Sequence, residues 1–303
     1  MKRIKQSPIV DFVIIGAMKA GSTTLVDYLQ QNVQLCFAKP KEPQYFSRFY
    51  DDWSVDSYES LWRFPEKICG EASTCYSRWP HYQNVPERLY KYNPDIKLIY
   101  ILRNPIDRAY SHYRHNVLVD RINYSSFDEA LDKSDEIIMT SCYMAQIKQF
   151  LDFFPKEQLL LVNFDDLIHH DIGTINSIES FLGVNLSIKS DFTSVHSNEA
   201  GVGVTRANIR KKIDKVRNLP FVKQFVDICF SQETRRNMRK LIYNKITDSS
   251  LVTKMATKKA LKFDSLKVEH CEKISRDLER ELIELEVFWG RDLSKWKTSK
   301  RIS

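Results

Sequence analysis

The fold is decided by residues 11–24, which read DFVIIGAMKAGSTT. Residues 11–16 hold a continuous apolar run rich in β-branched side chains, a pattern typical of a strand buried on both faces. Gly16 and Gly21 then bracket a loop, and apolar residues recur at helical spacing from Ser22 onward. The Ser-Thr-Thr run supplies hydroxyl side chains favoured at a helix start. The stretch therefore predicts a strand, a loop and a helix, the opening of a βαβ unit.

Two further apolar runs extend this pattern along the chain. Residues 96–102 predict a second buried strand, which ends at Pro105, where proline stops the strand and opens a helix. Residues 141–154 have helical spacing and lead into a third strand at 159–162. This alternation predicts an α/β fold: a three-layer, P-loop-like, doubly wound arrangement with a central parallel sheet flanked by helices.

The last third of the chain predicts helices only. Residues 206–303 lack strand patterns, and an amphipathic stripe ends at Gly290. The stripe consists of Leu278, Leu282, Leu285 and Phe288. We therefore expect a single domain over residues 1–303, with a core at 8–200 and a helical C-terminal extension at 206–303.

Composition and charge exclude several classes of protein. The chain has 303 residues, 43% of them hydrophobic, and a net charge of +7, as expected for a globular protein with a sizeable core. Its excess Lys and Arg residues lie scattered in the last third, without interleaved aromatics or a zinc pattern, so specific nucleic-acid binding is not expected.

The cysteine spacing and the length of the apolar runs indicate in which cellular compartment the protein is expected. The six cysteines are widely spaced and lack a Cys-x-x-Cys pair, which indicates reduced thiols. No run approaches the roughly 20 apolar residues that a membrane-spanning helix needs. Cytoplasmic localisation without a transmembrane segment is the expectation.

The loop at residues 16–24 is suited to bind an anion. A helix that starts directly after a strand and loop presents unpaired amides and a partial positive charge. A nucleotide triphosphatase P-loop places Lys directly after the last glycine, whereas Lys19 lies two residues before Gly21. This spacing weakens a nucleotide kinase or NTPase, which is kept as an alternative, as is a non-catalytic nucleotide-binding protein. An ordinary tight strand-to-helix turn with a surface lysine is the structural alternative.

Together with a second motif, this loop resembles the sulfotransferase superfamily, which uses 3′-phosphoadenosine 5′-phosphosulfate (PAPS) as sulfuryl donor. Residues 16–24 resemble the family's 5′-phosphosulfate loop, and residues 101–113 (ILRNPIDRAYSHY) resemble its 3′-phosphate motif. The resemblance implies that Arg103 and Ser111 hold the 3′-phosphate. It implies that the loop residues hold the 5′ side; these are Lys19, Ala20, Gly21, Ser22, Thr23 and Thr24. Lys19 is also expected to be catalytic, since it would stabilise the charge that develops on the bridging oxygen and phosphate.

The segment at residues 39–47 (KPKEPQYFS) resembles the carbohydrate branch of that family, which includes heparan sulfate sulfotransferases. The resemblance implies that Glu42 is the catalytic base, and a carboxylate suits the deprotonation of a sugar hydroxyl. Gln44 becomes a candidate for orienting the acceptor. Lys41 either holds an anionic sugar or is a surface charge.

Residues 70–76 and 85–94 also resemble the carbohydrate branch, and residues 285–296 resemble the end of bacterial-type members. The chain departs at Ala72, where the heparan sulfate enzymes have Lys, so their acceptor is not carried over. The expected activity is in-line O-sulfuryl transfer from PAPS, most favourably to a carbohydrate. No metal is expected, since the transferred group carries a single negative charge. The role of Arg206 and the oligomeric state stay open.

Overall fold

The computed structural model describes residues 8–118, 124–184, 263 and 265–299. By its internal contacts the chain divides into two compact units. The first comprises Met1–Tyr113, Phe127–Val195 and Ser265–Ser303, and it contains the sheet. The second comprises Arg114–Ser126 and His196–Asp264, and within it the Arg114 guanidinium lies over the Phe263 ring at 4.8 Å.

Five parallel strands form the sheet, in the order β2-β3-β1-β4-β5. They are β1 (Val10–Gly16), β2 (Leu35–Phe37), β3 (Ile68–Glu71), β4 (Lys97–Leu102) and β5 (Leu159–Asn163). The strands predicted at 11–16, 96–102 and 159–162 are thereby confirmed as β1, β4 and β5. The sequence did not predict β2 and β3, because strands of three and four residues are too short to show a pattern.

A close approach between β1 and β3 requires one glycine. Phe12 of β1 pairs with Gly70 of β3, and a Cβ atom at Gly70 would come within 2.2 Å of the Phe12 ring. Any side chain there would push the two strands apart. Gly70 therefore lets the edge of the sheet that continues into Glu71 pack closely against the central strand.

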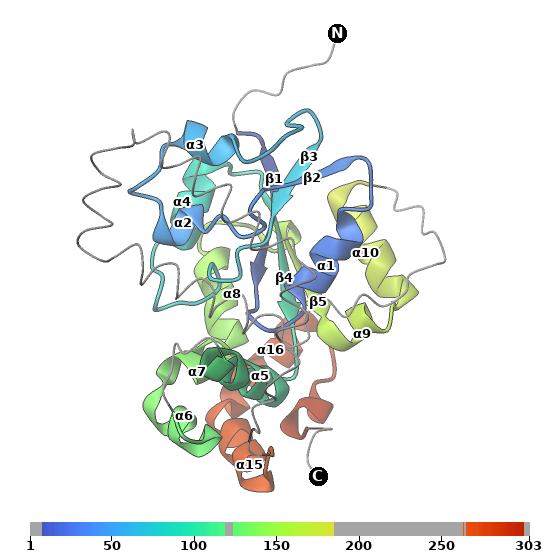
Figure 1. Ribbon diagram of the computed structural model, residues 1–303. Helices are drawn as coiled ribbons and strands as arrows, with labels where there is room; N and C mark the ends of the chain where they lie inside the picture. Colours follow the sequence, from blue (N-terminus) through green and yellow to red (C-terminus); the bar gives the residue numbers. More distant parts are fainter. Residues whose placement is uncertain (1–7, 119–123, 185–262, 264, 300–303) are drawn as a thin grey trace, which may run out of the picture. The chain divides into compact units, whose positions relative to one another are not determined.

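Helices cover both faces of the sheet, as Figure 1 shows, and this confirms the three-layer prediction. On one side lie α1 (Ser22–Leu29), α9 (Phe164–Ile168) and α10 (Ile172–Leu182). On the other lie α2 (Tyr45–Arg48), α3 (Val55–Glu59), α4 (Val85–Tyr92) and α8 (Tyr143–Leu151). The remaining segments before residue 184 are α5 (Pro105–Leu118), α6 (Phe127–Lys133), α7 (Asp135–Met139) and a 3-10 turn at Lys156–Gln158.

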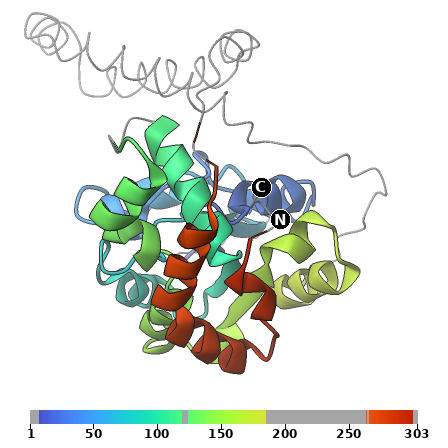
Figure 2. The same cartoon turned by 90° about the horizontal axis from the view of Figure 1, so that it is seen from below.

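The described C-terminal residues pack against the helices of the first unit. They form α15 (Val268–Asp277), α16 (Glu279–Trp289) and a 3-10 turn at Ser294–Lys297, drawn in red in Figure 2. The Glu281 carboxylate of α16 accepts the backbone N–H groups of Met144 (2.9 Å) and Ala145 (3.1 Å), at the N-terminus of α8. A carboxylate there satisfies amides that the helix leaves unpaired.

The predicted apolar stripe is present, and α16 ends at Gly290 with a φ of 70°. Leu278, Leu282 and Leu285 are buried, and Phe288 is half-buried. The expectation that residues 206–303 are wholly helical is wrong for residues 290–299, which form a loop and the 3-10 turn. The predicted boundaries at 200 and 206, Arg206 and Cys229 lie outside the described residues.

Residues 298 and 299 are hydrogen-bonded to the start of α5. Asn104 caps this helix, because its Oδ1 atom accepts the N–H of Ile106 at 3.0 Å. Its Nδ2 atom donates to the Thr298 carbonyl at 2.6 Å, and the Ser299 hydroxyl donates to Asp107 at 2.8 Å. Residues far apart in the sequence thus meet directly after β4. None of the helices in the described ranges is long and apolar enough to cross a membrane.

Candidate functional site

The loop between β1 and α1 is anchored to the neighbouring strand. The Ala17 N–H donates to the carbonyl of Ile101 in β4 at 2.8 Å, and the Ala20 N–H donates to the Ala17 carbonyl at 3.0 Å. Lys19 adopts a φ of 72° and is half-buried. These bonds fix the loop at the carboxyl edge of the sheet, where ligands of open α/β sheets bind.

Gly21 is the N-cap of α1, and its conformation demands glycine. Its φ is 91°, and a Cβ atom would lie 2.8 Å from the Phe164 ring. The expectation that the Ser-Thr-Thr run caps α1 is wrong, since Ser22 is already helical and no side chain caps the helix. The Ser22 and Thr23 hydroxyls instead accept from Lys41, and the first-turn N–H groups of α1 are left without a side-chain cap.

Arg103 lies beside the loop, as the sequence predicted. Its Nη1 atom donates to the Lys19 carbonyl at 3.0 Å, and its guanidinium lies 4.4 Å from the centroid of the Phe164 ring. Tyr143 holds the Arg103 carbonyl through a hydrogen bond of 2.7 Å. Ser111 lies on α5 and is half-buried, and its predicted contact with a 3′-phosphate stays a prediction.

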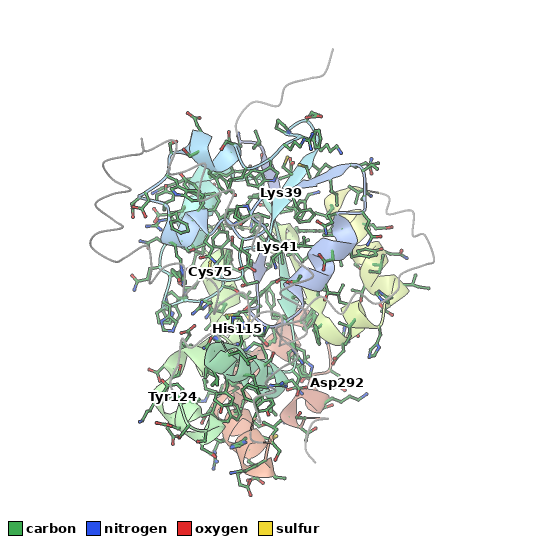
Figure 3. The ribbon with its side chains drawn as sticks, viewed as in Figure 1. Lys39, Lys41, Cys75, His115, Tyr124 and Asp292 are labelled. Atoms are coloured by element: carbon green, nitrogen blue, oxygen red, sulfur yellow. The ribbon has the colours of Figure 1, made fainter. Side chains whose placement is uncertain are left out.

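Lys41 joins the loop to the predicted base. Its Nζ atom lies 3.0 Å from Thr23 Oγ1, 3.3 Å from Ser22 Oγ and 3.1 Å from Glu42 Oε1. About a quarter of the Lys41 side chain and a third of the Glu42 side chain are exposed. Figure 3 labels Lys41 in the region between α1 and α2. One ammonium group thus bridges the start of α1 and the Glu42 carboxylate.

A turn at residues 41–46 carries Glu42 and rests on the segment that follows β3. The Ala72 N–H donates to the Lys41 carbonyl at 3.1 Å. Gln44 takes a φ of 58°, and its N–H donates to Ser73 Oγ at 2.9 Å. The Glu42 turn therefore lies at the same edge of the sheet as the loop, and the structure brings together Glu42, Lys41 and the hydroxyls of α1.

Glu71 is a charged residue that sequence reasoning left out of the site. It ends β3, is fully buried, and accepts hydrogen bonds from three hydroxyl groups. Its Oε1 atom accepts from Tyr58 (2.7 Å) and Tyr76 (2.8 Å), and its Oε2 atom from Ser73 (2.5 Å). The available signal was its place in residues 70–76, the segment that resembles the carbohydrate branch.

Burial raises the pKa of Glu71 to about 7. The hydrogen bonds from Ser73, Tyr58 and Tyr76 lower this pKa, and the charge of Glu42 raises it. Glu71 and Glu42 are therefore close enough to interact electrostatically. A perturbed carboxyl beside a cluster of polar groups is a feature of functional sites.

The residues fit a phosphate-bearing group. The first-turn amides of α1 are donors, and Lys41 adds a positive charge within reach of two hydroxyls. On the other side of Lys41, Glu42 is a carboxylate able to accept a proton. Among residues 8–118, 124–184 and 265–299, no group of three or more His, Cys, Asp or Glu side chains is placed to hold a metal ion.

A solved structure shares this fold. A sulfotransferase from Alicyclobacillus acidocaldarius aligns with a TM-score of 0.62 and 22% identity, over 95% of this chain and 99% of that one. That likeness establishes the fold.

Curated relatives are similar in sequence over part of the chain. Heparan sulfate glucosamine 3-O-sulfotransferase 6 of Mus musculus is 26% identical over 182 residues, which are 57% of this chain and 52% of the relative. The membrane-associated sulfotransferase kil1 of Dictyostelium discoideum is 31% identical over 139 residues, 43% of this chain and 29% of the relative. The chain thus spans about half the length of the first relative and less of the second.

The sequence model of one protein family matches most of the chain. The sulfotransferase domain matches residues 10–245, which include β1, the loop, the Glu42 turn and Arg103. This match extends over more than half of the sequence and confirms the resemblance on which the site was predicted. The chain belongs to the sulfotransferase family.

Proposed function

We propose that the protein transfers a sulfuryl group from PAPS to a hydroxyl group of an acceptor, with Glu42 as the base. The observation that supports this most is the position of Lys41, which contacts both the hydroxyls of α1 and the Glu42 carboxylate. A donor group bound at the loop and a hydroxyl bound at Glu42 would therefore meet beside one ammonium group. Such placement converts two reactants into neighbours.

The residues of the loop would bind the 5′ end of the donor. Lys19 and the amides from Gly21 onward supply positive charge, with Ala20 as part of the loop backbone and hydroxyls from Ser22, Thr23 and Thr24. Arg103, which touches the loop through the Lys19 carbonyl, and Ser111 would hold the 3′-phosphate. These charges would stabilise the negative charge that develops on the leaving phosphate.

When bound, PAPS supplies a sulfuryl group whose S–O bond to the 5′-phosphate breaks as the acceptor oxygen bonds to sulfur. Glu42 takes the proton from the acceptor hydroxyl, so that the oxygen attacks as it becomes anionic. Lys41 neutralises part of the charge between the two partners. Gln44, two residues after Glu42, would orient the acceptor. The proposed sequence of bonds needs no metal ion.

A carbohydrate is the acceptor that we propose. The curated relatives named heparan sulfate glucosamine 3-O-sulfotransferases act on a sugar by their names, and the Glu42 segment resembles that branch. Lys41 would then also meet an anionic substituent of the sugar. We also propose cytoplasmic residence, supported by the free thiols of the described cysteines: Cys36, Cys69, Cys75, Cys142 and Cys271.

The first test is calorimetric titration of 3′-phosphoadenosine 5′-phosphate (PAP), the expected product, in the presence of EDTA. We expect wild type to bind PAP, and Lys19→Ala and Arg103→Ala each to bind at least about tenfold more weakly, because each removes a cation from the anion site. Absence of binding to folded wild type would overturn the proposal and favour a magnesium-dependent kinase or NTPase.

The second test separates an enzyme from a nucleotide-binding protein. We expect wild type to transfer labelled sulfate from PAPS to members of an oligosaccharide panel, and Glu42→Gln to bind PAP normally while its kcat falls at least about a hundredfold. Binding of PAP without transfer to any acceptor, or an unchanged rate in Glu42→Gln, would contradict the catalytic role.

A further inference from the structure

The segment that carries Glu42 donates two backbone hydrogen bonds to hydroxyl groups. The Gln44 N–H donates to Ser73 Oγ at 2.9 Å, and the Phe46 N–H donates to the Tyr76 hydroxyl at 3.3 Å. Both hydroxyls in turn donate to the Glu71 carboxylate. Glu71 is thus linked, through one hydroxyl each, to the backbone of Gln44, the N-cap of α2, and of Phe46 in its first turn, without touching the turn itself.

The direction of these hydrogen bonds matches an ionised Glu71. Each hydroxyl has a single proton, and that proton is used on the carboxylate, so its oxygen can accept from the backbone. A third hydroxyl, that of Tyr58, also donates to Glu71. If Glu71 gains a proton, one hydroxyl must turn away to accept it, and its own proton then lacks this partner.

We propose that Glu71 is a positioning residue that sets the place of Glu42 by holding the turn of residues 41–46 through Ser73 and Tyr76. The effect on the turn follows from the contacts alone, whereas the effect on the reaction rate rests on the proposed function. Misplacement of a reacting group by about 1 Å costs on the order of a hundredfold in rate.

The charged and titratable groups around Glu71 come from several elements. Tyr58 and Glu59 lie on α3, and Tyr92 on α4 donates to Glu59 at 2.7 Å. Glu42 on the turn acts on Glu71 through its charge and is paired with Lys41, and Tyr45 of α2 stacks on Tyr58. Ser73, Cys75 and Tyr76 follow β3. In these surroundings burial raises the pKa of Glu71 to about 7, so both of its protonation states are populated near neutral pH.

The structural test is hydrogen–deuterium exchange of the peptide that spans residues 41–47, corrected for the intrinsic effect of pH. In wild type we expect protection of this peptide to increase as the pH rises through about 7, because Glu71 ionises and completes the network. In Glu71→Gln we expect exchange at least about tenfold faster at pH 8, without the step near neutrality.

The kinetic test follows kcat from pH 5.5 to 8.5, a range chosen to bracket the value of about 7. In wild type we expect kcat to fall as the pH drops below about 7, which gives the profile an acidic limb. In Glu71→Gln we expect this limb to be absent. PAP binding should be the same in both proteins. Tyr58→Phe keeps both bonds to the turn but removes a hydrogen bond that lowers the pKa of Glu71, so its limb should move to higher pH.

Glu59→Gln is the matched control, since Glu59 also accepts from a tyrosine hydroxyl but does not contact the turn hydroxyls. In Glu59→Gln we expect the fall of kcat at acidic pH, and the change in exchange of residues 41–47, to occur at the same pH as in wild type. The proposal is wrong if exchange of residues 41–47 is the same in Glu71→Gln and wild type, or if Tyr58→Phe leaves both the limb and the step in place. Failure of wild type to bind PAP would instead remove the proposed function and leave the exchange result standing.

Discussion

Lys41 is the residue that contacts both parts of the proposed site. It contacts two hydroxyls at the start of α1 and the Glu42 carboxylate, so a single side chain joins the anion loop to the turn. Its ammonium group carries a charge that a hydrophobic replacement could not supply. The sequence left open whether Lys41 was part of the site, because a charged residue in a loop is usually solvated.

We expect Lys41→Ala to lower kcat about a hundredfold, because a positive charge beside the transferred group is lost. Lys41→Arg should restore part of that loss. Lys39→Ala is the matched control, since Lys39 lies two residues away on the same segment but is exposed, and we expect less than about a twofold change. Steady-state rates of sulfate transfer measure the effect, and equal losses in Lys39→Ala and Lys41→Ala would contradict it.

Gly21 offers a prediction of stability at the residue scale. Gly21→Ala combines a left-handed backbone with a contact of 2.8 Å to the Phe164 ring, so we expect a loss of about 2–3 kcal/mol in the free energy of unfolding. Gly290→Ala has a similar φ of 70° but no atom within 4 Å, and we expect about 1 kcal/mol. Urea denaturation measures the free energy of unfolding of both variants. Equal losses would show that the Phe164 ring moves aside without cost.

At the scale of elements, the site depends on parallel strands that end at one edge of the sheet. β1 leads into the loop, β3 into Glu71 and the Ser73 segment, and β4 into Arg103. Because parallel strands share a carboxyl edge, residues from these connections gather there whatever their distance in sequence. The C-terminal helix α16 supports this edge indirectly, by capping α8 with Glu281.

Two glutamates on α16 separate the effect of the cap from that of a surface ion pair. Glu281→Ala removes an acceptor from the amides of Met144 and Ala145, so we expect a loss of about 1–2 kcal/mol in the free energy of unfolding. Glu284→Ala removes only a partly exposed ion pair with Lys148, and about 0–0.5 kcal/mol is expected. Thermal melts of both variants check this, and a reversed order would contradict the capping role.

At the scale of the whole molecule, Glu71 links folding to pH. Its pKa is about 7 in the folded protein, against an ordinary value of 4.5, so the folded state holds a proton that the unfolded state has released between these values. Stability from this group therefore falls as the pH rises from 4.5 to 7. We expect the Tm of wild type to decline over this range relative to that of Glu71→Gln, measured by calorimetry. Parallel curves for the two proteins would contradict the raised pKa.

The parts of the fold and the site that the sequence predicts are those set by residues close together in the sequence. The loop and Arg103 were predicted because each follows a strand with a strong apolar pattern, and the order of strands and helices places them at one edge. Glu71 was missed because its strand has four residues, including a glycine, and its partners Tyr58 and Tyr76 come to it only in the folded chain. Patterns along the chain record local periodicity, whereas a buried hydroxyl network is a product of tertiary packing.

The hydrogen bond between Asn104 and Thr298 has a consequence for the order of folding. The same Asn104 side chain accepts from Ile106, two residues away, and donates to Thr298, 194 residues away. A contact of long sequence separation forms only at a large cost in chain entropy, whereas a cap forms within its own helix. The start of α5 is therefore organised early by a local bond, and the surroundings of Arg103 are completed late by a distant one.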